Sequence, residues 1–261
     1  MREELKIIKK NPEFPLNLEI FKDGMTIDLS NNLIFFVGEN GSGKSTILDI
    51  IAYFSNANRI AYESKYNAVD FRYLKGIQKN VKLILEQYKN KIYFRSEDFI
   101  TYINYLHKEK EIMKEEIKRV NIEYKDKSNF TKAQALAPFT KTLYEIESMY
   151  ERDLLEQSHG QSYLDFFSSR LRENSLVILD EPESALSFNS LLVLISYIKK
   201  YINEGCKFII ATHSPVLMAM KEGIIYEVQE TDLKVSKYED LEQIQLLKQF
   251  LNNPEGFLRY L

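Results

Sequence analysis

The sequence lacks the features that mark disulfide-rich, membrane and strongly basic proteins. A single cysteine, Cys206, among 261 residues excludes a disulfide framework and a cysteine-based zinc site. No apolar run reaches the roughly 18 residues that a membrane span needs. The charged first ten residues lack the apolar centre of a signal peptide. The net charge is −3, so no overall positive field attracts nucleic acid. These absences predict a cytoplasmic protein that does not enter membranes.

The composition is that of an ordinary globular chain, with 44% hydrophobic and 28% charged residues. A chain of this length buries a sizeable core. Short runs rich in apolar residues at 33–37, 175–179 and 207–212 are typical of buried parallel strands, and the segments after the first two favour helices. Cys206, just before the last run, is predicted to be a small buried residue. We therefore expect one α/β domain over residues 1–261, built around a mostly parallel sheet.

The remaining segments predict additions to this sheet. Alternating apolar residues at 16–20 and 25–29 predict an N-terminal antiparallel pair of strands joined by a turn at 22–24. The pattern at 81–88 fits either a strand or a short helix, and 91–94 fits a strand. Residues 224–228 and 233–238 predict a terminal β pair. Apolar residues at 241–251 predict a last helix, which stops before Pro254.

The middle of the chain predicts a helical lobe. From 99 to 124 apolar residues recur at spacings of three, four and seven, as on one face of a helix. Residues 133–155 predict a second helix, interrupted at Pro138. The apolar stripe is too short for sustained coiled-coil heptads, so it favours a helix packed on its own domain. We expect this inserted helical lobe to cover residues 97–157.

A glycine-rich segment at 38–46 follows the first buried run and precedes a predicted helix. Its spacing, G-x-x-x-x-G-K-S, is the P-loop pattern. Glycines let the backbone fold closely around phosphates, and a helix N-terminus adds positive charge. Lys44 is predicted to contact the β- and γ-phosphates of ATP, and Ser45 to bind Mg²⁺. The predicted ATP-binding residues are Glu39, Asn40, Gly41, Ser42, Gly43, Lys44, Ser45 and Thr46.

Two further buried runs end in polar residues suited to phosphate chemistry. Asp180 closes the run at 175–179 and is predicted to reach Mg²⁺, usually through water. Glu181 follows it and could polarise a water for attack on the γ-phosphate. His213 follows the next strand, at the carboxyl edge where open α/β folds bind ligands.

A second phosphate cradle is predicted before the run at 175–179. Gln157-Ser158-His159-Gly160-Gln161 combines a hydroxyl, a glycine and a helix start. Taken alone, the segment could equally be a helix cap. One nucleotide needs only one such cradle, so the second would serve the ATP of a neighbouring subunit. Its predicted contacts in trans are Ser158, His159, Gly160 and Gln161.

Taken together, the order and spacing of these motifs resemble the ABC-type ATPases, and within them the SMC/RecF-like branch with its small stand-alone bacterial ATPases. The ABC-type motifs organise most of residues 33–215. The resemblance to the small stand-alone ATPases also includes 94–99, the Glu-Pro-Glu after Asp180 and the tail 250–261. It implies a P-loop fold with a helical lobe between the Walker A motif and the signature. It also implies catalytic roles for Glu181 and His213. The sequence departs from the family at His159, where glycine is usual, and at Ser187, where transporters carry aspartate.

The resemblance implies an ATP-sandwiched head-to-tail homodimer that uses Mg²⁺ and signals to a nucleic-acid or protein partner, in DNA repair or phage defence. No Q-loop glutamine is evident; Glu97 lies in roughly its place and is assigned as a further metal ligand. No adenine-stacking aromatic is distinguished among Phe14, Phe21 and others. Two alternatives remain open. A transporter's nucleotide-binding subunit is disfavoured by the missing glutamine, and an ATP-gated scaffold with negligible turnover by the presence of Glu181 and His213.

Overall fold

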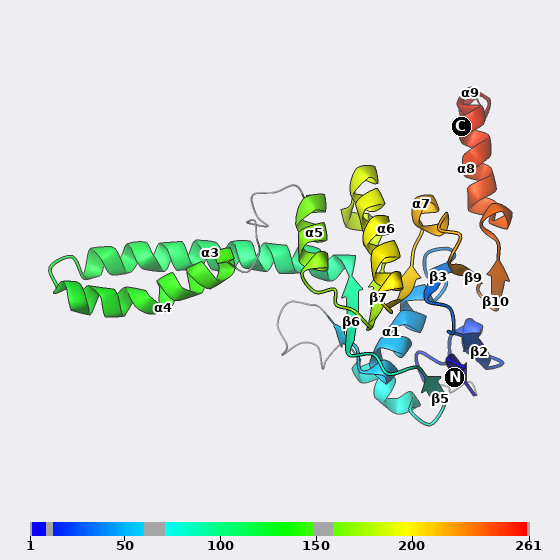
Figure 1. The fold of residues 1–261 in the computed structure, drawn as a ribbon, viewed down its shortest axis with the longest axis horizontal. Helices are drawn as coiled ribbons and strands as arrows, with labels where there is room; N and C mark the ends of the chain where they lie inside the picture. Colours follow the sequence, from blue (N-terminus) through cyan, green and yellow to red (C-terminus); the bar gives the residue numbers. More distant parts are fainter. Residues whose placement is uncertain (1, 9–12, 60–70, 149–158, 260–261) are drawn as a thin grey trace.

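The structure, a computed structural model, describes residues 2–8, 13–59, 71–148 and 159–259 (Figure 1). Its centre is a sheet in the order β10-β9-β3-β8-β7-β6-β4, parallel throughout except for the β10–β9 pair. The strands are β3 (Leu33–Val37), β4 (Asn58–Arg59), β6 (Asn90–Arg95), β7 (Ser175–Asp180), β8 (Lys207–Ala211), β9 (Ile224–Val228) and β10 (Leu233–Ser236). The predicted α/β fold with a mostly parallel sheet is confirmed.

Helices cover both faces of this sheet, which explains why its inner strands are buried and mostly apolar. Every residue of β3, β7 and β8 is buried. Successive side chains alternate between faces, so Phe35 joins one core cluster and Phe36 the other. On the Phe36 side lies α1 (Lys44–Ser55); on the Phe35 side lie α5 (His159–Ser168), α6 (Phe188–Asn203) and α7 (Pro215–Met218). Cys206 is buried, as predicted.

A smaller antiparallel sheet, β2-β1-β5, forms the N-terminal part of the fold. Its strands are β1 (Glu4–Ile7), β2 (Met25–Asp28) and β5 (Val81–Ile84), so the open assignment at 81–88 resolves as a strand. The strand predicted at 16–20 is wrong. There the chain forms turns and a short 3₁₀ helix, η1 (Glu19–Phe21), closed by bonds such as Leu18 N–H to Pro15 O at 3.1 Å. Leu16 and Ile20 are buried in these turns. Their spacing in the sequence resembles the alternation of a strand, which explains the wrong prediction.

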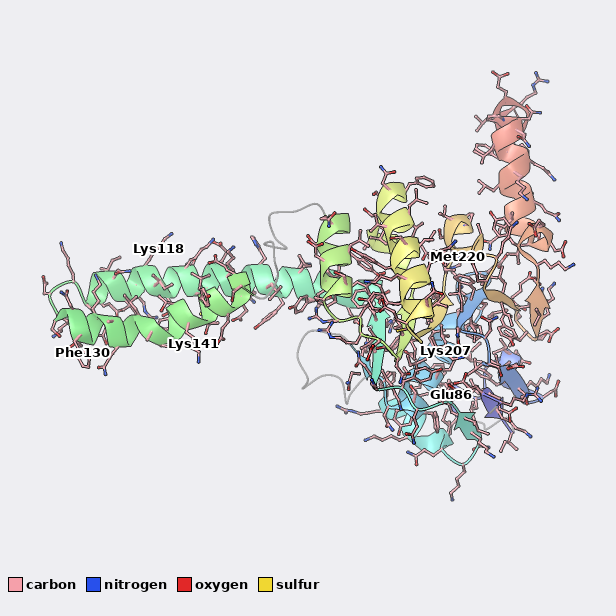
Figure 2. All side chains as sticks on the ribbon, viewed as in Figure 1. Glu86, Lys118, Phe130, Lys141, Lys207 and Met220 are labelled. Atoms are coloured by element: carbon pink, nitrogen blue, oxygen red, sulfur yellow. The ribbon has the colours of Figure 1, made fainter. Side chains whose placement is uncertain are left out.

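A buried ion pair joins the two sheets. Lys207 on β8 has no exposed surface, and its Nζ lies 2.6 Å from Glu3 Oε2. Nζ also donates to the carbonyls of Leu29 and Asn31. Glu3 Oε1 accepts bonds from the Glu86 N–H at 2.8 Å and the Tyr88 hydroxyl at 3.1 Å. A buried charge is tolerated when it is paired and hydrogen-bonded in this way. Figure 2 shows Lys207 inside the body of the molecule.

The two central helices form a projecting arm. The helix α3 (Ser96–Glu123) continues directly from β6, and α4 (Asn129–Ser148) returns beside it (Figure 1). Near the root, Phe99 and Leu106 reach the main core, whereas α4 has no buried residue. The predicted packing of this helix on its own domain is therefore wrong beyond the root. The apolar stripe of α3 contacts α4 instead, and Lys118, Phe130 and Lys141 lie far from the body (Figure 2).

The helix α4 also departs from its prediction, because it runs through Pro138 without interruption. Pro138 is exposed, so the backbone carbonyl that loses its N–H partner is near solvent. Residues 149–157, the last part of the predicted lobe, lie outside the described residues.

The C-terminal part ends in two helices that rise from the body (Figure 1). The predicted helix is α8 (Glu242–Asn252), and it stops before Pro254. A further short helix, α9 (Pro254–Leu258), starts at that proline, where Asn253 Oδ1 accepts the Gly256 N–H at 3.0 Å. Three short 3₁₀ helices complete the description: η2 (Arg72–Ile77), η3 (Pro182–Ala185) and η4 (Tyr238–Asp240). None of the described helices is long and apolar enough to cross a membrane.

Candidate nucleotide-binding site

The predicted P-loop links the end of β3 to the start of α1. Gly38 has a φ of 148°, and a Cβ there would lie 2.3 Å from the Val228 carbonyl oxygen, so only glycine fits. Gly43 has a φ of 104° and precedes the first helical residue, Lys44. The loop borders a pocket of about 420 Å³. The pocket is lined by Phe14, Leu18, Asn40, Gly41, Gly43, Lys44, Ser45, Thr46 and Glu181.

Lys44 lies in the centre of this loop. Its side chain is almost fully buried, and Nζ donates to the carbonyls of Gly38 at 2.9 Å and Glu39 at 2.8 Å. Burial lowers the pKa of the ammonium, and the negative charges of Glu181 and Asp180 partly oppose this. A phosphate entering the loop would replace these two carbonyls as the partner of Nζ.

Ser45 and Asp180 meet beside the P-loop although 135 positions separate them in the sequence. The Ser45 hydroxyl donates to Asp180 Oδ1 at 3.1 Å. Asp180 is 5% exposed, and burial raises its pKa to about 6, opposed by Arg95 and by the bond from Ser45. A hydroxyl and a carboxylate beside a phosphate loop are the oxygen donors that Mg²⁺ takes in nucleotide sites. These two residues therefore fit a magnesium ion.

Arg95 forms an ion pair with this carboxylate, and the sequence analysis assigned it no role. It ends β6, directly opposite Asp180 in the register with β7. Its Nε lies 3.3 Å from Asp180 Oδ2, close enough for an ion pair, although the two atoms are not aligned as a hydrogen bond. No sequence motif predicts this pairing, because it depends on which strands become neighbours.

Glu181 has an uncommon backbone for a residue with a side chain, with φ at 49°. Its N–H donates to the Ala211 carbonyl at 2.9 Å, and its carbonyl accepts the Ser96 hydroxyl at 2.6 Å. These bonds hold the turn, and the side chain on the pocket wall is 42% exposed. Its Oε1 lies 3.5 Å from His213 Nε2. The two predicted catalytic residues are thus brought together.

Glu183 fixes the segment that carries His213. Its Oε1 accepts the Thr212 hydroxyl at 2.7 Å and the His213 N–H at 2.6 Å. The imidazole Nε2 of His213 is buried without a hydrogen-bond partner among the described residues. A polar atom of this kind beside a phosphate loop fits a ligand oxygen. The Glu-Pro-Glu segment was noted in the sequence, but the role of Glu183 was missed.

Glu97 lies in the first turn of α3, with a side chain that is 84% exposed. Its Oε2 is 3.5 Å from a terminal guanidinium nitrogen of Arg95, and Glu97 is not among the residues that line the pocket. Arg95 thus lies between Glu97 and Asp180, the carboxylate that fits a magnesium ion.

The described part of the predicted signature lies away from the Lys44 pocket. Gln157 and Ser158 fall outside the described residues. His159 begins α5, and a Cβ on Gly160 would lie 2.8 Å from Ser190 Oγ at the start of α6. Gln161 donates to Asp165 Oδ1 at 2.8 Å. Ser187 caps α6 by accepting the Ser190 N–H at 3.2 Å.

The structure also separates the aromatic candidates. Phe21 has no exposed surface, whereas Phe14 is 51% exposed and lines the P-loop pocket. The Phe14 ring centre lies 5.2 Å from that of Tyr73.

Comparison with protein families decides the assignment. The family described as "AAA ATPase domain" matches residues 17–168, which is more than half of the chain and includes the P-loop and the arm. The chain belongs to this family. The ATPase membership expected from the motifs is therefore confirmed. No curated protein matches this chain.

Solved structures with some similarity include ATPase cassettes and an SMC head. A nucleotide-free ATP-binding cassette from an ABC transporter is 15% identical with a TM-score of 0.47, covering 100% of this chain and 99% of that one. The Smc head domain with an extended coiled coil from Pyrococcus furiosus is 14% identical with a TM-score of 0.44, covering 95% and 99%. A dimeric bacterial ABC transporter cassette is 14% identical with a TM-score of 0.42, covering 92% and 100%.

Proposed function

We propose that this AAA ATPase domain binds ATP with Mg²⁺ in the P-loop pocket and hydrolyses it to ADP and phosphate. The observation that carries the proposal is the meeting of four groups around one pocket. Lys44 lies inside the loop, Ser45 bonds to Asp180 at 3.1 Å, and Glu181 lines the same wall. These residues come from two strand ends that are distant in the sequence, and membership of an ATPase family supports the same chemistry.

Each residue has a distinct role in this proposal. The ammonium of Lys44 and the backbone N–H groups of the loop bind phosphate oxygens. Ser45 and Asp180 hold Mg²⁺, which when bound neutralises phosphate charge. The half-exposed carboxylate of Glu181 orients and deprotonates the attacking water. The unpartnered Nε2 of His213 donates to the γ-phosphate. Phe14, the exposed aromatic on the pocket wall, contacts the base.

The second part of the proposal is a head-to-tail homodimer. Gly160 and Gln161 lie at the start of α5, which is not part of the Lys44 pocket in the same chain. We assign them, with Ser158 and His159, to the ATP of the partner subunit. Closure on ATP and opening after hydrolysis follow because only ATP supplies a γ-phosphate that both subunits contact. The output is a conformational signal to a nucleic-acid or protein partner, of the kind that serves DNA repair or phage defence, and the arm is the element suited to carry it.

The experiment is the solution mass of Glu181→Gln protein, measured by light scattering with and without Mg-ATP. A Glu181→Gln protein that cannot complete hydrolysis is expected to double in mass only with Mg-ATP. Lys44→Ala is the control, because without its ammonium the loop cannot hold the phosphates and the mass stays at the monomer value. A mass that ignores ATP despite measured ATP binding would contradict the sandwich dimer. If the wild type binds ATP and dimerises but does not hydrolyse ATP, the alternative of an ATP-gated scaffold with negligible turnover would be favoured instead.

A further inference from the structure

Arg95 lies between the predicted metal site and the arm. On one side its Nε is 3.3 Å from Asp180 Oδ2. On the other side a terminal nitrogen is 3.5 Å from Glu97 Oε2, in the first turn of α3. The guanidinium of Arg95 therefore contacts two carboxylates, that of Asp180, which is 5% exposed, and that of Glu97, which is 84% exposed.

The other acidic groups nearby already have partners. Asp49 accepts the hydroxyls of Tyr73 at 2.5 Å and Tyr93 at 2.7 Å. Asp98, next to Glu97, forms two bonds of 2.8 Å with Arg59. Glu97 already contacts Arg95 and is well exposed, so it can receive the guanidinium when Arg95 leaves Asp180.

A divalent cation bound by Asp180 would compete with Arg95 for the same carboxylate. A buried carboxylate requires a nearby positive charge, and Arg95 supplies one to Asp180 at 3.3 Å. Mg²⁺ held by Ser45 and Asp180 would supply the same compensation and would repel the guanidinium. When Arg95 moves away it breaks an ion pair but no aligned hydrogen bond, because its Nε has none among the described residues.

We propose that Arg95 is a positioning residue that occupies Asp180 until Mg-nucleotide binds, then moves toward Glu97 and so couples the metal site to the arm. The inference rests on the proposed function, because it requires Mg-nucleotide at this site. The connection to the arm is direct. Ser96, the first residue of α3, also donates to the Glu181 carbonyl, and α3 continues for 28 residues, or about 42 Å, to the arm tip. A small rotation at the root becomes a larger displacement at the tip.

The first test measures how much Mg²⁺ is needed for tight binding of a fluorescent ATP analogue. Arg95→Gln removes the competing cation and is expected to lower the half-saturating Mg²⁺ concentration by about tenfold. Arg95→Lys keeps the charge and is expected to stay near the wild-type value. Lys89→Gln is the matched control, since it removes a lysine paired with Glu173 at 3.1 Å on the surface before β6. Lys89→Gln should leave the half-saturating Mg²⁺ concentration unchanged.

The second test measures the arm. Spin labels on cysteines introduced at exposed positions 127 and 221 report the distance between the tip and the body, and native Cys206 is buried and does not interfere. Mg-nucleotide is expected to shift this distance in wild type and Arg95→Lys, but not in Arg95→Gln. The same shift in Arg95→Gln would overturn the coupling.

The outcomes separate the two proposals. If the wild type does not bind nucleotide, the proposed function fails and this inference fails with it. Nucleotide binding with the same Mg²⁺ requirement in wild type and Arg95→Gln refutes the role of Arg95 alone. If Arg95→Gln does not fold, Glu97→Gln decides: without the receiving carboxylate the Mg²⁺ requirement should rise, and an unchanged requirement would overturn the inference.

Discussion

Glu183 offers the sharpest test of how the site is held together. Its carboxylate accepts two short hydrogen bonds, at 2.7 Å from Thr212 and 2.6 Å from the His213 N–H. Hydrogen bonds to a charged group contribute about 1.5–3 kcal/mol each. Glu183→Ala loses both, and water refills part of the space, so we expect a loss of about 3 kcal/mol in unfolding free energy. For a domain of 261 residues this lowers Tm by about 5 °C.

The same substitution should affect catalysis, because the bond to the His213 N–H fixes where the imidazole lies. A displacement of about 1 Å reduces kcat by about a hundredfold. Glu183→Gln keeps an acceptor oxygen at this position and should lose only about 1 kcal/mol. Thermal melting and ATPase assays measure both effects. Glu222→Ala is the matched control, since Glu222 forms an exposed pair with Lys199 at 3.4 Å. If Glu183→Ala melts and turns over like Glu222→Ala, Glu183 does not hold the His213 segment.

Three further outcomes follow. Ser158→Arg should leave ATP binding intact and abolish turnover, because its target is the partner's nucleotide; full ATPase activity would refute the contact in trans. The next outcome concerns pH and is measured in EDTA, which removes metal ions. Burial raises the pKa of Asp180 to about 6 in the folded protein, so at pH values between about 4 and 6 the folded state binds a proton that the unfolded state does not. Stability should therefore fall by about 3 kcal/mol as pH rises from about 4 to 6, and Asp180→Asn should remove this dependence in pH-resolved denaturation. Lys207→Met should cost about 3–5 kcal/mol by leaving Glu3 buried without its cation, and adding Glu3→Gln should recover part of this.

The sequence predicted the parallel sheet and the P-loop because both are local patterns. A wholly apolar run such as 33–37 is buried on both faces wherever its neighbours lie, and the P-loop spacing is contiguous. The predicted meeting of Ser45 with Asp180, and of Glu181 with His213, followed because the carboxyl ends of parallel strands share one edge.

The features that were missed depend on tertiary partners. Periodicity showed that α3 has an apolar face but could not show that α4, rather than the body, covers most of it. Arg95 faces Asp180 only because β6 and β7 become neighbours, 85 positions apart in the sequence. The strand β1 has four residues, too few for alternation to stand out.

The pairing of Glu3 with Lys207 has a consequence for how the protein is made. Its two members enter the growing chain 204 positions apart, so Glu3 leaves the ribosome long before its cation exists. Until β8 is synthesised, the N-terminal sheet cannot close over the centre without burying an unpaired carboxylate. We therefore expect the last step of core formation to come late in translation, with the early strands exposed for the longest time. A ribosome stalled before residue 207 should carry an N-terminal half that proteases still cleave.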